Sequence, residues 1–247
     1  MNEMSQWQKW FACLLFVAVV SLVLLHLRVT AGQTESDAEN LKRAAERIAE
    51  TARTKFAPVY PALAKQIIED TGVKEGICID LGTGAGALGI ALAKAGNFKV
   101  YAVDINPFAV AIAQKNAVEA EVSDRFFPML GNALDLPFKD NFADLVVSRG
   151  MIPFIEDKAA VFREAYRVLK KGGAAYIGGG FSRMLDEETV VKIVKEAWGD
   201  PQKLPVHRVP REVWEEQIKK AGIKNYRIIE DCYPSGVYGI WIMFKKQ

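Results

Sequence analysis

The dominant pattern along the chain is an alternation of short apolar runs with longer segments whose apolar residues recur three and four positions apart. The short runs predict strands and the longer segments predict amphipathic helices. Strands that alternate with helices of roughly 10–15 residues imply right-handed crossovers and a mainly parallel sheet, so the predicted class is a doubly wound α/β fold. The predicted strands cover 77–79, 100–103, 126–130, 143–148, 174–177, 226–230 and 240–244, and the predicted helices cover 41–54, 61–70, 87–94, 107–120, 158–169, 186–198 and 211–221.

The last two predicted strands break this alternation. Residues 226–230 and 240–244 are joined by a segment that contains Pro-Ser-Gly and has no helical pattern. A parallel connection needs a longer crossover, so this pair is expected to be antiparallel. A parallel sheet finished by an antiparallel strand differs from most dehydrogenase domains.

A second pattern lies at the N-terminus, where residues 11–27 are apolar except for Ser21 and His26. A helix of that length rises about 26 Å, close to the hydrocarbon thickness of a thin bilayer. We expect a single transmembrane helix, and the basic residues that follow it, beginning with Arg28, favour a cytoplasmic C-terminal domain. A cleaved signal peptide ending at Val29-Thr30-Ala31 and a buried core helix are the alternatives.

The expected organisation is therefore a membrane anchor (1–31), a polar linker (32–40) and one catalytic domain (41–247). A chain of 247 residues holds one such domain and an appendage, but not two domains. A formal net charge of +2 gives no electrostatic footprint for nucleic acid, so a small-molecule or lipophilic substrate fits better. The three cysteines have no C-x-x-C spacing and indicate neither a disulfide framework nor a metal site.

Candidate chemistry begins at the first strand-to-helix turn, Asp80-Leu81-Gly82-Thr83-Gly84-Ala85-Gly86. Glycines there let a ligand approach the backbone and the free N–H groups of the following helix. The run 84–89 also satisfies G-x-G-x-x-G, so a nicotinamide dinucleotide stays possible. Asp80 precedes the first glycine, where a carboxylate suits the ammonium of an amino-acid ligand better than a pyrophosphate. Asp104, at the end of the second strand, can accept hydrogen bonds from ribose hydroxyls of either cofactor.

An adenine is expected beyond the third strand. The side-chain oxygen of Asn132 could accept from an adenine amine, and the Ala133 N–H could donate to a ring nitrogen.

Together the segments 80–86, 103–105, 131–138 and 167–173 resemble the class I S-adenosylmethionine (SAM) dependent methyltransferases, and most closely the branch of the ubiquinone and menaquinone C-methyltransferases. The resemblance covers about residues 56–244. It implies a seven-stranded sheet with the antiparallel strand last and SAM across the carboxyl ends of the strands. The cofactor-binding residues that it and the motifs above indicate are Asp80, Gly82, Thr83, Gly84, Gly86, Asp104, Ile105, Asn132, Ala133 and Ser148.

The substrate side is less specific. The fourth strand ends in Ser148-Arg149-Gly150 rather than Asn-Pro-Pro-Tyr, which argues against amino-group methylation of bases or glutamine. Tyr60, Arg149 and Phe181 are the substrate candidates, with a packing aromatic, a surface ion pair and a core residue as their respective alternatives. Arg149 could pair with an anionic substrate or with the carboxylate of SAM.

A segment inserted between Gly180 and Pro210, which includes the helix 186–198, is expected to act as a lid over the substrate. No catalytic residue is assigned, since His207 is more readily a loop residue than a base.

Three functions follow from these patterns: a membrane-anchored methyltransferase, a SAM-binding protein without transfer activity, and a nicotinamide-dependent oxidoreductase. The first agrees with most of the motifs.

Overall fold

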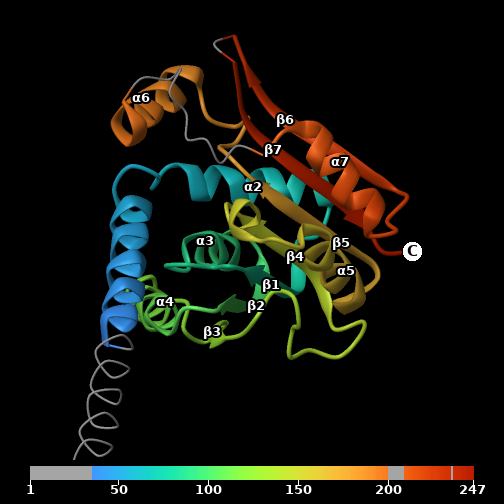
Figure 1. The fold of residues 1–247 in the computed structure, drawn as a ribbon, viewed down its shortest axis with the longest axis horizontal. Helices are drawn as coiled ribbons and strands as arrows, with labels where there is room; N and C mark the ends of the chain where they lie inside the picture. Colours follow the sequence, from blue (N-terminus) through green and yellow to red (C-terminus); the bar gives the residue numbers. More distant parts are fainter. Residues whose placement is uncertain (1–34, 200–208, 235) are drawn as a thin grey trace, which may run out of the picture. The chain divides into compact units, whose positions relative to one another are not determined.

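A seven-stranded sheet with the order β3-β2-β1-β4-β5-β7-β6 forms the centre of the fold (Figure 1). The computed structural model of the chain describes residues 35–199, 209–234 and 236–247. β7 is antiparallel to both β5 and β6, and the other neighbouring pairs are parallel. The predicted fold class and the antiparallel last strand are thus confirmed. The strands are β1 (Glu75–Leu81), β2 (Asn97–Asp104), β3 (Phe126–Leu130), β4 (Ala143–Arg149), β5 (Leu169–Gly179), β6 (Tyr226–Tyr233) and β7 (Gly236–Lys245).

Helices cover both faces of this sheet. One hydrophobic cluster joins α2, α3 and α4 to one face, and a second joins α5 and α7 to the other. Successive strand residues point to opposite faces. In β1, for example, Cys78 belongs to the first cluster and Ile79 to the second. The helices are α2 (Val59–Thr71), α3 (Ala87–Ala95), α4 (Pro107–Glu119), α5 (Lys158–Val168), α6 (Glu187–Trp198) and α7 (Arg211–Lys220), with a short 3-10 turn η1 (Ile152–Phe154) after β4.

Several element boundaries differ from the sequence prediction by a few residues, and two of these differences have a clear local reason. α2 begins at Val59 rather than at residue 61, because Pro61 lies in the first helical turn, where no backbone N–H is needed. Tyr60 is therefore part of the helix and does not precede it. β5 begins at Leu169, directly after α5, rather than at residue 174, because the segment 170–173 continues the strand past a register irregularity.

The N-terminal part also differs from the prediction. The polar stretch 32–40 was expected to be a linker, but residues 35–53 form one continuous helix. Residues 45–247 form one compact unit that contains the sheet and helices α2–α7. The predicted anchor segment 11–27 lies outside the described residues. Within the described ranges, no helix is both long and apolar enough to cross a bilayer.

Candidate functional site

The loop after β1 is built from three glycines with left-handed backbone. Gly82, Gly84 and Gly86 have φ angles of 63°, 55° and 82°. Side chains with a Cβ rarely adopt such angles, so glycine is required by the shape of the loop. Gly86 is also the N-cap of α3, which leaves backbone N–H groups of the first helical turn facing the carboxyl edge of the sheet.

Asp80 braces this loop from beneath. Its Oδ2 accepts hydrogen bonds from the Thr83 hydroxyl at 2.6 Å and from the Gly89 N–H at 3.1 Å. The residue is buried, and burial raises the pKa of its carboxyl to about 7, against the opposing effect of these two hydrogen bonds. The structure thus adds a loop-bracing role that sequence did not foresee. Its proximity to a ligand ammonium stays a prediction.

Asp104 ties the end of β2 to the same loop. Its Oδ2 accepts from the Gly84 N–H at 2.8 Å, and its Oδ1 accepts from the Asn106 N–H at 2.9 Å. A carboxylate oxygen has more than one acceptor site, so both oxygens can still receive ribose hydroxyls. The Thr83 N–H donates to the Val103 carbonyl at 3.1 Å and joins the loop to β2 once more.

Apolar side chains stand exposed beyond β2 and β3, where an adenine was expected. Ile105, next to Asp104, is 72% exposed, and Leu130 at the end of β3 is 59% exposed. Exposed aliphatic side chains beside a half-buried carboxylate suit a ligand with a flat apolar ring and a hydroxylated sugar. The Asn132 side-chain oxygen accepts from the Leu134 N–H at 3.0 Å and keeps a second acceptor site, so its contact with an adenine stays a prediction. Ala133 is largely buried beside it.

Ser148 is the cofactor candidate whose side chain lies farthest from solvent. It is fully buried in β4, and its hydroxyl donates to the Leu81 carbonyl at 2.8 Å. The hydroxyl therefore connects β4 to the end of β1, just before the glycine loop.

The edge next to this loop is bare backbone. Gly150 follows β4, and its N–H donates to the Gly178 carbonyl at 2.7 Å. A Cβ added at Gly150 would meet no atom within 4 Å, so the space above it is open. Met151 marks the border with the loop, since a Cβ at Gly82 would collide with its side chain. Open backbone beside a ligand loop can admit a second molecule.

The three substrate candidates gather around one residue that sequence analysis missed, Phe56. The Arg149 guanidinium carbon lies 4.8 Å from the Phe56 ring centroid and 5.2 Å from that of Tyr60. Phe181 stacks on Phe56 with centroids 5.8 Å apart, but it is buried, which favours its core alternative. The spacing of Phe56 and Tyr60, four residues apart before a predicted helix, is the signal that could have found this group.

The inserted segment that carries α6 packs on the same aromatic residue. The Trp198 ring lies edge-on to Phe56, with centroids 5.5 Å apart, and the Lys55 ammonium donates to the Glu196 carbonyl at 2.7 Å. The segment thus lies beside Arg149 and the open glycine edge. His207 lies outside the described residues.

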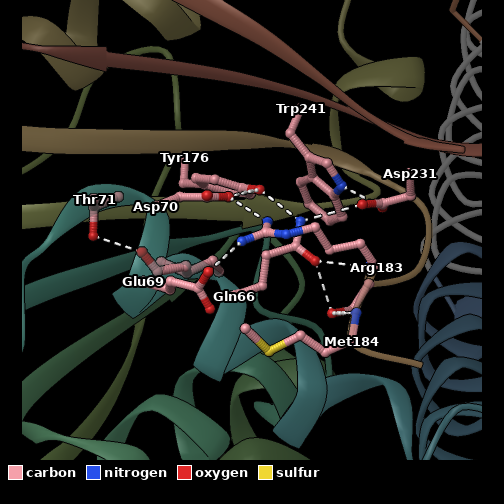
Figure 2. Close-up of polar contacts among 11 residues, drawn as sticks. Gln66, Glu69, Asp70, Thr71, Tyr176, Arg183, Met184, Asp231 and Trp241 are labelled. Atoms are coloured by element: carbon pink, nitrogen blue, oxygen red, sulfur yellow. Dashed lines mark hydrogen bonds and ion pairs between the residues drawn. The ribbon is translucent and has the colours of Figure 1, made fainter. Parts of the chain in front are cut away.

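A buried polar network fastens the start of this segment, and it also escaped sequence analysis. The Gln66 amide oxygen accepts from the Ser182 hydroxyl at 2.7 Å and the Arg183 N–H at 2.8 Å, while its nitrogen donates to Tyr176 at 2.8 Å and to Asp231 at 3.2 Å. Figure 2 shows Gln66 at the centre of this group. Burial raises the pKa values of Tyr176 and Asp231. Every donor and acceptor of the Gln66 amide is used, so the network is structural.

Comparison with known proteins agrees with this geometry. Residues 79–177 match the family model described as methyltransferase domain. Erythromycin 3''-O-methyltransferase of Saccharopolyspora erythraea is 32% identical over 173 residues, which are 67% of this chain and 56% of that protein. Demethylmenaquinone methyltransferase of Lactiplantibacillus plantarum is 40% identical over 96 residues, which are 38% of this chain and 40% of that protein. The chain thus spans little more than half of the length of the first relative and less than half of the second.

A solved structure extends the likeness over most of the chain. It is a candidate SAM-dependent methyltransferase from Methanococcus maripaludis, with 38% identity and a TM-score of 0.75. The match covers 83% of this chain and 93% of that one. Together with the glycine loop, the acid at the end of β2 and the strand order, these matches show that the chain belongs to the class I SAM-dependent methyltransferases and that its cofactor is SAM.

Proposed function

We propose that the protein transfers the methyl group of SAM to a small or lipophilic acceptor at the cytoplasmic surface of a membrane. The observation that carries this proposal is the division of the carboxyl edge of the sheet. The glycine loop and Asp104 occupy the β1–β2 side, while the open backbone of Gly150 lies just after β4. Two ligands can therefore lie next to each other over adjacent strands.

The cofactor side fits SAM by its donor and acceptor set. The left-handed glycines leave no Cβ between the loop backbone and a ligand, Asp104 offers acceptors for the ribose, and the exposed Ile105 and Leu130 can cover an adenine. We propose that the buried Asp80 keeps the loop in shape and places negative charge near the amino-acid part of the cofactor. Because these groups are held by hydrogen bonds before any ligand arrives, little reorganisation is needed on binding.

The part of the site that holds the methyl acceptor has to orient that molecule and to exclude water. When bound, SAM would supply a methyl group to the acceptor nucleophile in line with the breaking carbon–sulfur bond, with S-adenosylhomocysteine as the leaving group. Alignment of the nucleophile is therefore the main requirement on the protein. No dedicated base is needed when the nucleophile is already deprotonated or has no proton to lose. We propose that the segment with α6, packed on Phe56 beside the open edge, acts as the lid that closes over the acceptor.

Two observations support the acceptor class and the location. The named activities of the relatives above concern erythromycin and demethylmenaquinone, one a small molecule and the other a lipophilic one. The apolar run 11–27 is long enough to hold the chain at a bilayer, where lipophilic acceptors concentrate. The nicotinamide alternative is not retained, since the family and its cofactor are those of methyl transfer.

The proposal is tested with the full chain, purified in a neutral detergent, and SAM labelled on its methyl group. We expect label to enter the organic phase of a membrane lipid and metabolite extract. At a SAM concentration near the wild-type Kd, Asp104→Ala should strongly reduce the transfer, while Asp124→Ala, which removes an exposed acid from the turn before β3, should leave it intact. If labelled SAM binds but no label moves into any fraction, the protein is a SAM-binding component without transfer activity.

The location is tested separately by fractionating cells that express the full chain. A membrane-anchored protein stays with the membrane pellet through alkaline carbonate washing, and removal of residues 1–31 releases it. Full recovery of the intact chain in the soluble fraction would contradict membrane attachment without touching the methyl-transfer proposal.

A further inference from the structure

Arg149 is a cation at the open edge of the site without an acidic partner among the described residues. The ion pairs of the described chain include Arg163 and Arg183, for example, but not Arg149. Its polar contact is a hydrogen bond from Nε to the Gly180 carbonyl at 3.0 Å. The side chain is half-buried. The surface ion pair, which was the alternative explanation for this residue, is therefore not what holds it.

The guanidinium is held in one orientation by neutral groups. The rings of Phe56 and Tyr60 lie 4.8 Å and 5.2 Å from its carbon, and the Gly180 carbonyl fixes Nε. Aromatic faces and a carbonyl stabilise a cation without neutralising it. The N–H groups of both terminal nitrogens keep the fork geometry that matches a carboxylate or a phosphate, with little side-chain entropy left to lose on binding.

The place of Arg149 in the sheet assigns it to the acceptor. It ends β4, and its contacts come from Phe56, from α2 and from the residue after β5. The cofactor loop and Asp104 belong to β1 and β2, on the other side of β4. The open backbone of Gly150, adjacent in sequence, provides room for a ligand next to the guanidinium.

We infer that Arg149 binds an anionic group of the methyl acceptor, a carboxylate or a phosphate, and so selects acidic acceptors over neutral ones. This inference rests on the proposed methyl transfer and names the substrate class for the same site. Phe56 and Tyr60 act as positioning residues that hold the guanidinium, and the acceptor approaches over Gly150. A lipophilic acceptor is compatible with this selection if its polar end carries the charge.

The experiment measures binding of small anions to the full chain in neutral detergent, saturated with S-adenosylhomocysteine. The probes are benzoate and phenyl phosphate, with benzamide as the uncharged counterpart of benzoate. Their binding is measured by ligand-observed NMR or by calorimetry. We expect at least one of the two anions to bind about tenfold more tightly than benzamide, as a charge-assisted bidentate contact requires. The two anions together show whether carboxylate or phosphate is the group recognised.

Variants locate the effect. Arg149→Gln should remove the preference for the anion and keep S-adenosylhomocysteine binding within about twofold, because the cofactor half does not depend on this residue. Arg149→Lys keeps the charge but not the planar fork, so part of the preference should return. Arg163→Gln removes the same charge from the surface of α5 and should bind like the wild type.

Each alternative outcome is distinguishable. If neither benzoate nor phenyl phosphate binds more tightly than benzamide, or if neither anion binds to the cofactor-loaded wild type at about 20 mM, the inference is overturned. A tenfold loss of S-adenosylhomocysteine affinity in Arg149→Gln would assign the residue to the cofactor carboxylate instead. Failure of the wild type to bind S-adenosylhomocysteine at all would count against the proposed function, whatever Arg149 does. A folded Arg149→Gln is established beforehand by its unfolding transition.

Discussion

The glycine loop and the Gln66 network are both made of hydrogen bonds, yet they are built in different ways. In the loop, Asp80, Thr83 and Gly89 meet within ten positions of the chain, and Asp104 is twenty positions from its partner Gly84. In the network, Gln66 joins partners 110, 116 and 165 positions away (Tyr176, Ser182 and Asp231). The first holds a ligand loop and the second holds the chain segment that leads to α6.

This difference predicts a separation of roles. The loop has a half-buried carboxylate, Asp104, that a ligand can reach. Substitutions in the loop should therefore lower the affinity for SAM. The Gln66 network is buried, and the Gln66 amide makes all its hydrogen bonds within the protein. Substitution of Gln66 should therefore lower the free energy of unfolding. Substitutions in one region should leave the quantity governed by the other nearly unchanged.

The largest expected effect comes from Gln66→Leu. Leucine has a similar size but leaves the Ser182 hydroxyl, the Tyr176 hydroxyl and Asp231 without this partner in the interior. We expect the free energy of unfolding to fall by about 3–4 kcal/mol, measured by urea unfolding of the full chain, because each unsatisfied buried group costs about 1–3 kcal/mol.

Gln114→Leu, on the exposed side of α4, is the matched control and should change stability by less than about 0.5 kcal/mol. SAM affinity of Gln66→Leu should stay within about threefold of the wild type at a temperature where the variant is folded. A variant that keeps its stability but loses SAM binding would reverse the assignment of the two regions.

Asp104→Ala is expected to give the next largest effect. It removes the carboxylate that accepts from the Gly84 N–H and that we propose as the acceptor for the ribose. SAM binding should weaken by about 2–3 kcal/mol, which is roughly 30- to 150-fold in Kd, by calorimetry. Asp124→Ala, a surface acid, should bind SAM like the wild type. Unchanged affinity in Asp104→Ala would mean that the ribose lies elsewhere.

The same contrast explains what could be predicted from the sequence. The alternating fold, the loop and Asp104 were predicted because their determinants are contiguous or repeat at a fixed period. The bracing role of Asp80 was not, since the hydrogen bond to Gly89 depends on how α3 leaves the loop. The turn of Asn132 with Leu134 also depends on local backbone geometry that residue type alone does not fix.

The acceptor side could be predicted only as a set of single residues. The spacing of Phe56 and Tyr60 could indicate an aromatic pair, but it does not relate Phe56 to Arg149 or to Trp198, because these contacts arise when the turn before α2 meets the end of β4 and α6. Gln66 looked like an ordinary polar residue of an amphipathic helix. Its burial follows from β6 and β7, whose Asp231 and Trp241 close over it.

A pH effect of intermediate size is expected from Asp80. A carboxyl with a pKa of about 7 is about one-tenth ionised at pH 6 and nine-tenths ionised at pH 8. If the cationic cofactor requires the ionised form, wild-type affinity for SAM should rise about tenfold over this range relative to Asp80→Asn, whose amide does not titrate. Taking the ratio cancels the titration of SAM itself, and Asp124→Asn should retain the wild-type dependence. Equal pH profiles for wild type and Asp80→Asn would show that the cofactor does not sense this carboxyl.

The free energy of unfolding of the cofactor-free protein should fall as the pH rises, whereas the affinity for SAM should rise. The unfolded chain releases the Asp80 proton near 3.8 and the folded chain near 7, so folding becomes less favourable as the pH rises between these values. Urea unfolding should therefore show a fall in wild-type stability from about pH 4 to pH 7 that is smaller in Asp80→Asn. A difference between the two proteins that is independent of pH would contradict the raised pKa.

The smallest predicted effect concerns Ser148, which lies in β4 between the cofactor loop after β1 and the proposed acceptor side at Arg149 and Gly150. Ser148 was expected to bind the cofactor, but its buried hydroxyl donates to the Leu81 carbonyl at the end of β1. We expect Ser148→Ala to lower the free energy of unfolding by about 1 kcal/mol through the loss of this hydrogen bond and to change the Kd for SAM by less than about twofold. Ser123→Ala, at an exposed position before β3, is the control and should change neither quantity. A tenfold loss of SAM affinity with unchanged stability would show that the Ser148 hydroxyl contacts the cofactor. The cofactor site would then extend from the loop after β1 to β4.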